Sequence, residues 1–367
     1  MNTGSFHSLR GSLPTAALLL VILGIIYTAT EIIGSPVLGQ FVIRMYIYLI
    51  LVVGLQIFMG NSNILWFPHV AFMGIGAYVS SICSMEPFQK SISLTSLYPI
   101  LADIHLPFLP ALLVGALAAA IVAAILGLPL MRLSDFPVVI TSFALLIILH
   151  VVMTNWHSLT NGPQTFFGVD QFTDLKTAAI WAAIVVVVAC VFRESKVGLQ
   201  LRASRDDSIS AGAIGIDLIK VRWIALVLSA FIAGLGGGLF AHFITSFTPK
   251  AFFLTETFVI LAMLVIGGPA TVSGAVIGTI LVTVIYQSLR WVENTLNIHQ
   301  VFSGNVAGLT DTGLSLILIA MLILRPGGFL ERRELSPGVP AAWLTRKRPA
   351  GASLTPQVSA TQEQELK

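Results

Sequence analysis

The chain has 367 residues, of which 56% are hydrophobic and only 10% are charged, and its mean hydropathy is +0.90. The surface of a soluble domain needs more charged side chains than this to interact with water, and the composition therefore indicates a membrane protein. The net charge of +3 is too small to predict a nucleic-acid-binding surface, and the two cysteines, Cys83 and Cys190, lie in apolar runs and are interpreted as packing residues.

Ten apolar runs approach the roughly 20 residues that a helix needs to cross a bilayer. In chain order they cover 14–33, 41–59, 64–84, 108–130, 136–153, 178–192, 222–246, 254–270, 274–291 and 312–325. The third run contains Pro68 and two glycines, so it is expected to be broken or re-entrant, and the sixth is short. We therefore expect an all-α polytopic membrane protein with about ten transmembrane helices, in a range of eight to ten.

Basic residues are distributed unevenly among the segments that join these runs. A cytoplasmic N-terminus with alternating spans places most of the 20 Lys and Arg residues in cytoplasmic segments, where basic side chains collect. Both termini and the long connection 193–222 are therefore expected to be cytoplasmic. Residues 1–335 are expected to form one transmembrane domain, with its first run retained rather than cleaved as a signal. Residues 336–367 are expected to form a disordered cytoplasmic tail.

Motifs for catalysis and nucleotide binding are missing from the sequence. It contains no G-x-x-x-x-G-K-[ST] phosphate loop and no G-x-S-x-G, H-E-x-x-H or C-x-x-C pattern. No paired carboxylates or metal ligands converge in the pattern either, so neither an enzyme nor a cofactor-binding chain is predicted. A conduit of this kind must take its energy from an ion gradient or from another subunit.

Polar groups inside the apolar runs are few, and each is a candidate for a translocation pathway because burying it in lipid is unfavourable. The polar side chains at depth are Gln56, His69, Thr141, Ser142, His242, Glu256 and Gln287, and those singled out for a pathway are His69, Thr141, Ser142 and Glu256. Glu256 lies near a span end, so it could instead reach water. The glycines Gly267, Gly268 and Gly274 in "GGPATVSG" are candidates for a gating turn, and the alternative is ordinary close packing of helices.

The stretch "LRASRDDSISAGAIGIDLIK", residues 201–220, concentrates charge in an otherwise apolar chain. Ser204 followed by Asp207 predicts a helix start, and the pattern indicates a short helix over about 205–215. Ala211 and Gly215 share one face of that helix, and Ile209 and Ile216 offer apolar contacts, so the helix suits insertion into a groove on another protein. The alternative is a solvated loop that its charges hold in the cytoplasm.

Four stretches in order carry a resemblance to a known family. They are "LRASRDDSISAGAIGIDLIKVRWIALVLSAFIAGLGGGLFAHF" (201–243), "PHVAFMGIGAYVSS" (68–81), "ILAMLVIGGPATVSGAVIGT" (260–279) and "LILRPGGF" (322–329). Together they resemble LivM-type permeases, the membrane subunits of bacterial branched-chain amino acid ABC importers. The resemblance runs from about residue 40 to residue 335.

The resemblance implies an importer in the bacterial inner membrane with a periplasmic substrate-binding protein, two transmembrane permeases and two cytoplasmic ATPases. This chain would be one permease, paired with a second permease and surrounded by lipid, and it would bind no cofactor itself, since the partner ATPases use ATP and Mg. The positions that the resemblance places against an ATPase are Arg202, Arg205, Asp206, Asp207, Ala211 and Gly215.

Departures from the family pattern concern the transported solute. Pro68 stands where the family usually has a glycine before the motif histidine. The stretch 141–145 lacks the acid that often ends this motif in the family, and Val259 stands where a glutamate is common in the family. Branched-chain amino acids, urea, short amides and other small polar solutes therefore stay open. An ion-coupled secondary transporter is a further alternative, but it predicts acidic groups at mid-membrane, whereas Glu256 and Glu293 lie near span ends.

Overall fold

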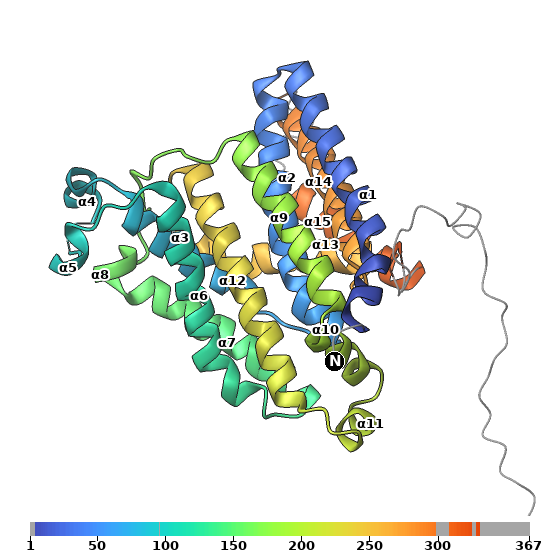
Figure 1. The fold of residues 1–367 in the computed structure, drawn as a ribbon. Coiled ribbons are helices and arrows are strands. Elements are labelled where there is room, and N and C mark those ends of the chain that lie inside the picture. Colours follow the sequence, from blue (N-terminus) through green and yellow to red (C-terminus); the bar gives the residue numbers. More distant parts are fainter. Residues whose placement is uncertain (1–3, 95, 299–307, 325–327, 331–367) are drawn as a thin grey trace, which may run out of the picture.

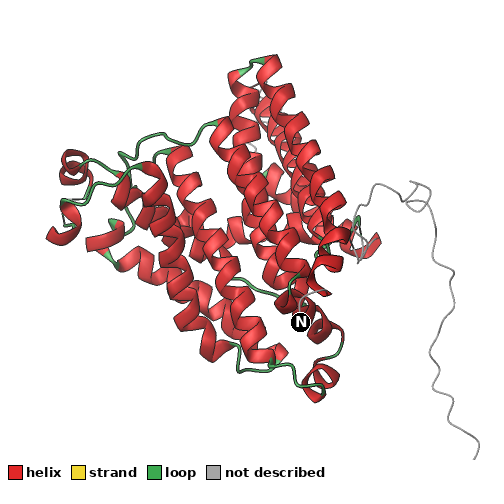
Figure 2. Cartoon of the chain, viewed as in Figure 1, coloured by secondary structure: helices red, strands yellow, loops and turns green. Residues whose placement is uncertain are grey.

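The computed structural model describes residues 4–94, 96–298, 308–324 and 328–330. Within these ranges the chain is a bundle of helices, and its β-type pairing is a single bridge between Phe166 and Phe247 (Figures 1 and 2). The expected all-α fold is confirmed. The predicted tail, 336–367, lies outside the described residues.

The long helices follow the predicted runs closely. They are α1 (Gly4–Ile33), α2 (Pro36–Leu55), α3 (His69–Ser84), α6 (Phe108–Leu130), α7 (Asp135–Asn155), α9 (Leu175–Glu194), α12 (Leu218–Ile244), α13 (Leu254–Gly267), α14 (Val272–Ile298) and α15 (Leu309–Leu324). Shorter elements are the π-helix η1 (Gln56–Gly60), α4 (Pro87–Ser93), α5 (Pro99–Ala102), α8 (His157–Thr160), α10 (Lys196–Asp206), α11 (Ser208–Ala213) and the 3-10 helix η2 (Pro249–Phe252).

Eight helices of the described chain are long and apolar enough to cross a membrane, at the lower end of the expected range. The third run is the main difference, because its helix begins at His69 and has only 16 residues. Residues 63–67 before it are not helical, and Asn63 has φ +61°. Pro68 precedes the first helical residue, as expected from the backbone restriction around proline. The sixth run is longer than predicted and forms a helix of 20 residues.

The helices form two groups that meet at α12 (Figure 1). One group contains α3, α6, α7 and α12, and the other contains α1, α2, α9, α13, α14 and α15. In the most apolar stretch of each helix, 89% of the residues are buried in the segment that begins with α2, but only 22% are buried in α1. Helix α2 is therefore internal, and α1 lies at the periphery of the bundle. Two helices that are linked in sequence therefore have different roles in packing.

Glycine contacts determine how closely α12 approaches its neighbours. A Cβ on Gly237 would lie 1.9 Å from the Met73 carbonyl oxygen of α3, and one on Gly76 would lie 2.1 Å from the Gly234 carbonyl oxygen. A Cβ on Gly115 of α6 would lie 2.7 Å from the Gly76 carbonyl oxygen. Three helices thus touch through backbone, as small residues allow in lipid.

The connection between α9 and α12 carries α10 and α11 and marks one end of the bundle, called here the loop end (Figure 1). At another edge of the molecule, α4, α5 and α8 project from the bundle. The buried Lys90 of α4 holds that projection together, because its Nζ donates hydrogen bonds to the carbonyl oxygens of Leu101, at 3.0 Å, and Ile104. Burial lowers the pKa of this lysine, whose charge is stabilised by these backbone dipoles.

Candidate functional site

The loop end contains two helices where the sequence predicts one. Ser195 begins α10 by accepting a hydrogen bond from the Gly198 amide at 3.1 Å, and Asp217 begins α12 in the same way with the Lys220 amide. Ser204 is not a helix start, as its hydroxyl is buried within α10 and donates to the Leu201 carbonyl at 2.7 Å. The predicted helix over 205–215 is therefore wrong in its boundaries, and Asp207 separates two helices.

Asp207 is the N-cap of α11. Its Oδ1 accepts hydrogen bonds from the backbone amides of Ile209, at 2.9 Å, and Ser210, at 3.0 Å, while its Oδ2 accepts one from the Ser210 hydroxyl at 2.5 Å. These hydrogen bonds, chiefly that from the Ser210 side chain, lower the pKa of the Asp207 carboxyl below its ordinary value. An ionised cap of this kind defines the first turn of a helix that is otherwise too short to be stable alone.

Gly215 ends α11 in a Schellman motif. It has φ +86°, its amide donates to the Gly212 carbonyl at 3.0 Å, and the Ile216 amide reaches back to the Ala211 carbonyl at 3.1 Å. The position requires a left-handed backbone, so glycine serves the turn, and its predicted contact with an ATPase stays a prediction.

The surface of α11 is apolar where the sequence suggests small residues. Ala211 is buried against its own chain and Ile216 packs on the core, whereas Gly215 is exposed, so the predicted face lies only partly on the outer surface. Ile209 and Ile214 are exposed by 85% and 77% instead. Two large apolar side chains on a short capped helix form a compact candidate docking site.

The two predicted arginines are half-buried and turn back toward the chain. Arg202 Nη2 donates to the Arg193 carbonyl at 3.0 Å, which closes the connection upon itself. Arg205 Nη1 donates to the Gly60 carbonyl at 2.7 Å, across 145 positions of sequence. The acids Asp206 and Asp207 are exposed. The predicted contact residues therefore divide into inward-facing and outward-facing groups.

The polar candidates for a pathway are held by separate partners. His69 is buried, with Nε2 at 2.9 Å from the Leu51 carbonyl and Nδ1 at 3.3 Å from the Ser229 hydroxyl, so it joins α3 to α2 and α12. Glu256 Oε2 accepts a hydrogen bond from the Tyr48 hydroxyl at 3.1 Å. None of these contacts joins two predicted pathway residues.

Thr141 and Ser142 bond within their own helix. The Thr141 hydroxyl donates to the Pro137 carbonyl at 2.8 Å, and the Ser142 hydroxyl donates to the Val139 carbonyl at 2.8 Å. Ser142 is fully buried and Thr141 is half-exposed. A hydroxyl that is hydrogen-bonded within its own helix can lie in an apolar region at little cost, so these two residues fit a structural role, and their role in a pathway stays a prediction.

The predicted gating turn is tightly packed. A Cβ on Gly267 would lie 2.0 Å from the Gly274 carbonyl oxygen, and one on Gly278 would lie 2.2 Å from the Met263 carbonyl oxygen. Gly268 has φ +111° and ends α13. The glycines thus bring α13 and α14 into backbone contact, as the packing alternative predicts. The gating role stays a prediction.

A buried amide, Gln56, lies at the end of α2. There the helix widens into the π-helix η1, and both polar atoms of the Gln56 side chain are buried without a hydrogen-bond partner among the described residues. The neighbouring Asn61 donates to the Ile57 carbonyl at 3.0 Å, and its Oδ1 has no partner there either. The sequence signal is a polar triplet, Asn61 to Asn63, directly after an apolar run. π-Helices of this length often mark functional sites.

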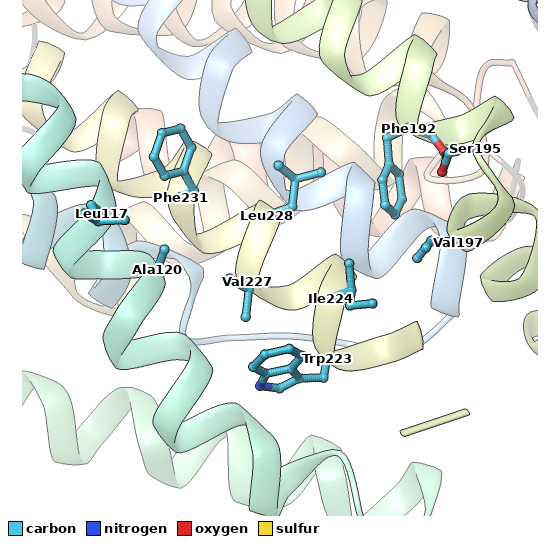
Figure 3. Close-up of a pocket in the computed structure, with 10 residues that line it drawn as sticks. All are labelled: Leu117, Ala120, Phe192, Ser195, Val197, Trp223, Ile224, Val227, Leu228 and Phe231. Atoms are coloured by element: carbon cyan, nitrogen blue, oxygen red, sulfur yellow. Dashed lines mark hydrogen bonds between the residues drawn. The ribbon is translucent and has the colours of Figure 1, made fainter. Parts of the chain in front are cut away.

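The pocket in Figure 3 is apolar and lies between α6, α12 and the start of α10. It has a volume of about 470 Å³ and is lined by Leu117, Ala120, Phe192, Ser195, Val197, Trp223, Ile224, Val227, Leu228 and Phe231. Trp223 lies at its edge, and its Nε1 donates to the Ala124 carbonyl at 2.9 Å. A polar solute finds almost no hydrogen-bonding groups here, so this pocket is not a solute site. The described residues contain no cluster of metal ligands.

The chain is similar in sequence to several known permeases. The chain is 24% identical over 319 residues to the high-affinity branched-chain amino acid transport system permease protein LivM of Escherichia coli, covering 77% of this chain and 68% of that protein. A probable ABC transporter permease protein, y4mJ, of Sinorhizobium fredii is 26% identical over 202 residues, 53% of this chain and 58% of that protein. The guanosine ABC transporter permease protein NupQ of Bacillus subtilis is 29% identical over 97 residues, 26% of this chain and 30% of that protein.

No solved structure matches the chain. The model of one protein family, described as the permease component of the branched-chain amino acid transport system, matches residues 37–323. This range includes α2, the π-helix, the loop end and most of α15. The resemblance seen in the four sequence stretches is therefore confirmed over most of the chain, which belongs to the branched-chain amino acid transport permease family.

Proposed function

We propose that the chain is a transmembrane permease subunit of an ATP-driven importer in the bacterial inner membrane, with the loop end in the cytoplasm. The observation that carries the proposal is α11, a short helix with an Asp207 cap and two exposed isoleucines, on a chain of this permease family. A helix that presents apolar side chains into water is explained if another protein covers them.

The proposed partners follow from the chemistry that the chain lacks. Its sequence has no phosphate loop, so ATP and Mg would be used by two separate ATPase subunits, which would dock at Ile209 and Ile214. A second permease and a periplasmic substrate-binding protein complete the proposed importer. Closure of the ATPases on ATP would push α11 and bias the bundle between outward-open and inward-open states.

The proposed cargo is a branched-chain amino acid or a related small polar solute. Family membership and similarity to LivM support the amino acid. Other similar permeases are named for nucleosides and guanosine, so the scaffold serves more than one kind of solute. Urea and short amides are the alternative that the sequence departures suggest. Calorimetric titration of the cognate binding protein with leucine, isoleucine, valine, urea and acetamide distinguishes these solutes.

Docking is tested by purifying the tagged chain with its co-expressed ATPase subunits. Burial of one isoleucine contributes about 1.5–3 kcal/mol, so Ile209→Ser and Ile214→Ser should each weaken the ATPase association by roughly 10- to 150-fold. Leu199→Ser is a matched control, since Leu199 is 45% exposed on α10 of the same connection. An unchanged ATPase association in the double isoleucine variant would contradict the assigned interface.

A further inference from the structure

The end of α2 is a weak point in the most buried helix. From Gln56 to Gly60 its hydrogen bonding changes to the wider π pattern, and the helix ends two residues later, at Ser62. Such a segment is easier to rearrange than regular helix because its hydrogen bonds are already displaced from the α-helical pattern. The unpaired Gln56 amide makes the observed arrangement unfavourable by itself, because a buried polar group without a partner is destabilising.

Arg205 connects this weak point to the loop end. Its guanidinium donates to the carbonyl oxygen of Gly60, the last residue of η1, at 2.7 Å. A charged donor at the C-terminal end of a helix is favourable, because the terminal carbonyls have no partner within the helix. Only Asp206 lies between Arg205 and the Asp207 cap of α11, so a displacement of α11 reaches the end of α2 over a very short path.

The far side of Gly60 rests on the turn between α13 and α14. A Cβ on Gly60 would lie 2.1 Å from the Pro269 carbonyl oxygen, so the two backbones are in contact. That turn is itself held, since the amides of Phe329 and Leu330 donate to the carbonyls of Ile266, at 2.9 Å, and Gly267, at 3.2 Å. Gly60 therefore lies between the Arg205 guanidinium and a turn that is held by backbone hydrogen bonds.

We infer that Arg205 is a positioning residue that transmits the movement of α11 to the π-helical end of α2, rather than a residue that contacts the ATPase. The contact of its guanidinium with the Gly60 carbonyl carries the movement, and the Gln56 amide gains a partner when the π-helix rearranges. This inference rests on the proposed function, in which an ATPase moves α11.

The test uses the complete transporter in proteoliposomes, with its binding protein and the solute identified by titration. Three quantities are measured: ATPase association, ATP hydrolysis, and solute taken up per ATP hydrolysed. For Arg205→Gln we expect normal association and retained hydrolysis, with uptake per ATP reduced at least about tenfold, as for loss of a charge-assisted hydrogen bond. Arg205→Lys should restore part of the uptake because one charged donor remains.

Lys196→Gln is the matched control. Lys196 is an exposed basic residue of α10, in the same connection, and it is not among the predicted ATPase contacts. Its replacement removes one positive charge from the connection and leaves the Arg205 contact in place, so uptake per ATP should stay near that of the unmodified transporter.

Hydrogen exchange provides a second measurement, and its first part needs only the unmodified transporter. The amides of residues 56–63 should change their exchange rate when the unmodified transporter is trapped with ATP and vanadate, and Arg205→Gln should abolish that change. No change in the unmodified transporter, or unchanged uptake per ATP in Arg205→Gln, overturns the inference. So does a parallel loss of ATPase association and uptake, which makes Arg205 a docking residue. If the unmodified chain binds no ATPase, the proposed function itself fails.

Discussion

Replacing Gly237 by alanine tests whether backbone contact between α12 and α3 determines the packing of the bundle. The added Cβ would lie 1.9 Å from the Met73 carbonyl oxygen, whereas ordinary contacts begin at 3.4 Å. The neighbour is backbone in the middle of a helix, so no side-chain rotamer relieves the overlap. Overpacking of this kind costs about 3 kcal/mol, at the upper end of the usual range, and the better helix propensity of alanine returns at most about 1 kcal/mol.

The net destabilisation of about 2 kcal/mol corresponds to a roughly 30-fold lower ratio of folded to unfolded protein. Thermal unfolding in detergent, followed by size-exclusion chromatography, measures it. Gly24→Ala is the matched control, because a Cβ on Gly24 of α1 meets nothing within 4 Å, and it should be neutral or slightly stabilising. Equal melting temperatures for the two variants would refute the idea that this contact limits the approach of the helices.

Changes at three further positions probe the cap and the polar pairs. Asp207→Asn should keep α11 protected from hydrogen exchange, whereas Asp207→Ala should not. Because the pKa of Asp207 is lowered in the folded chain, the ionised cap stabilises α11 fully above the unfolded pKa of about 3.8. This stabilisation is lost as the pH falls through the lower pKa of the folded chain, and Asp207→Asn should not show that loss. His69→Leu should lower the melting temperature by removing about 1–3 kcal/mol, since the Leu51 carbonyl loses its partner. Tyr48→Phe should raise the KM for uptake less than twofold if Glu256 is structural.

The spans and the charged connection were predictable from the sequence because they depend on local composition. Apolar runs of about 20 residues have few alternatives to a helix in lipid, so most span limits agree with α1 to α14. A short helix was also expected in the charged connection, and α11 is found there with different limits. Family membership adds to this reading but was already indicated by the four sequence stretches.

The details of the loop end depend on choices that local sequence does not resolve. Ser and Asp stabilise a helix N-terminus by similar amounts, so the sequence does not show whether Ser204 or Asp207 is the N-cap. In the fold Ser204 is buried within α10, which leaves Asp207 as the cap. The inward contact of Arg205 joins residues 145 positions apart and leaves no periodic signal. The π-helix is similarly hidden, because "LQIFMG" continues the apolar pattern of α2 without a break.

The glycines between α13 and α14 hold these two helices together, so we expect the helices of the bundle to move relative to one another at a different place. Gly267, Gly274 and Gly278 lock α13 to α14 through backbone contacts, so these helices should move as one body together with their turn. α12 is locked to α3 in the same way through Gly76 and Gly237. Movement is then concentrated between the two locked pairs, where α2 lies against both α12 and α14. The π-helical end of α2 is in that position, and Arg205 connects it directly to the helix that would meet the ATPase.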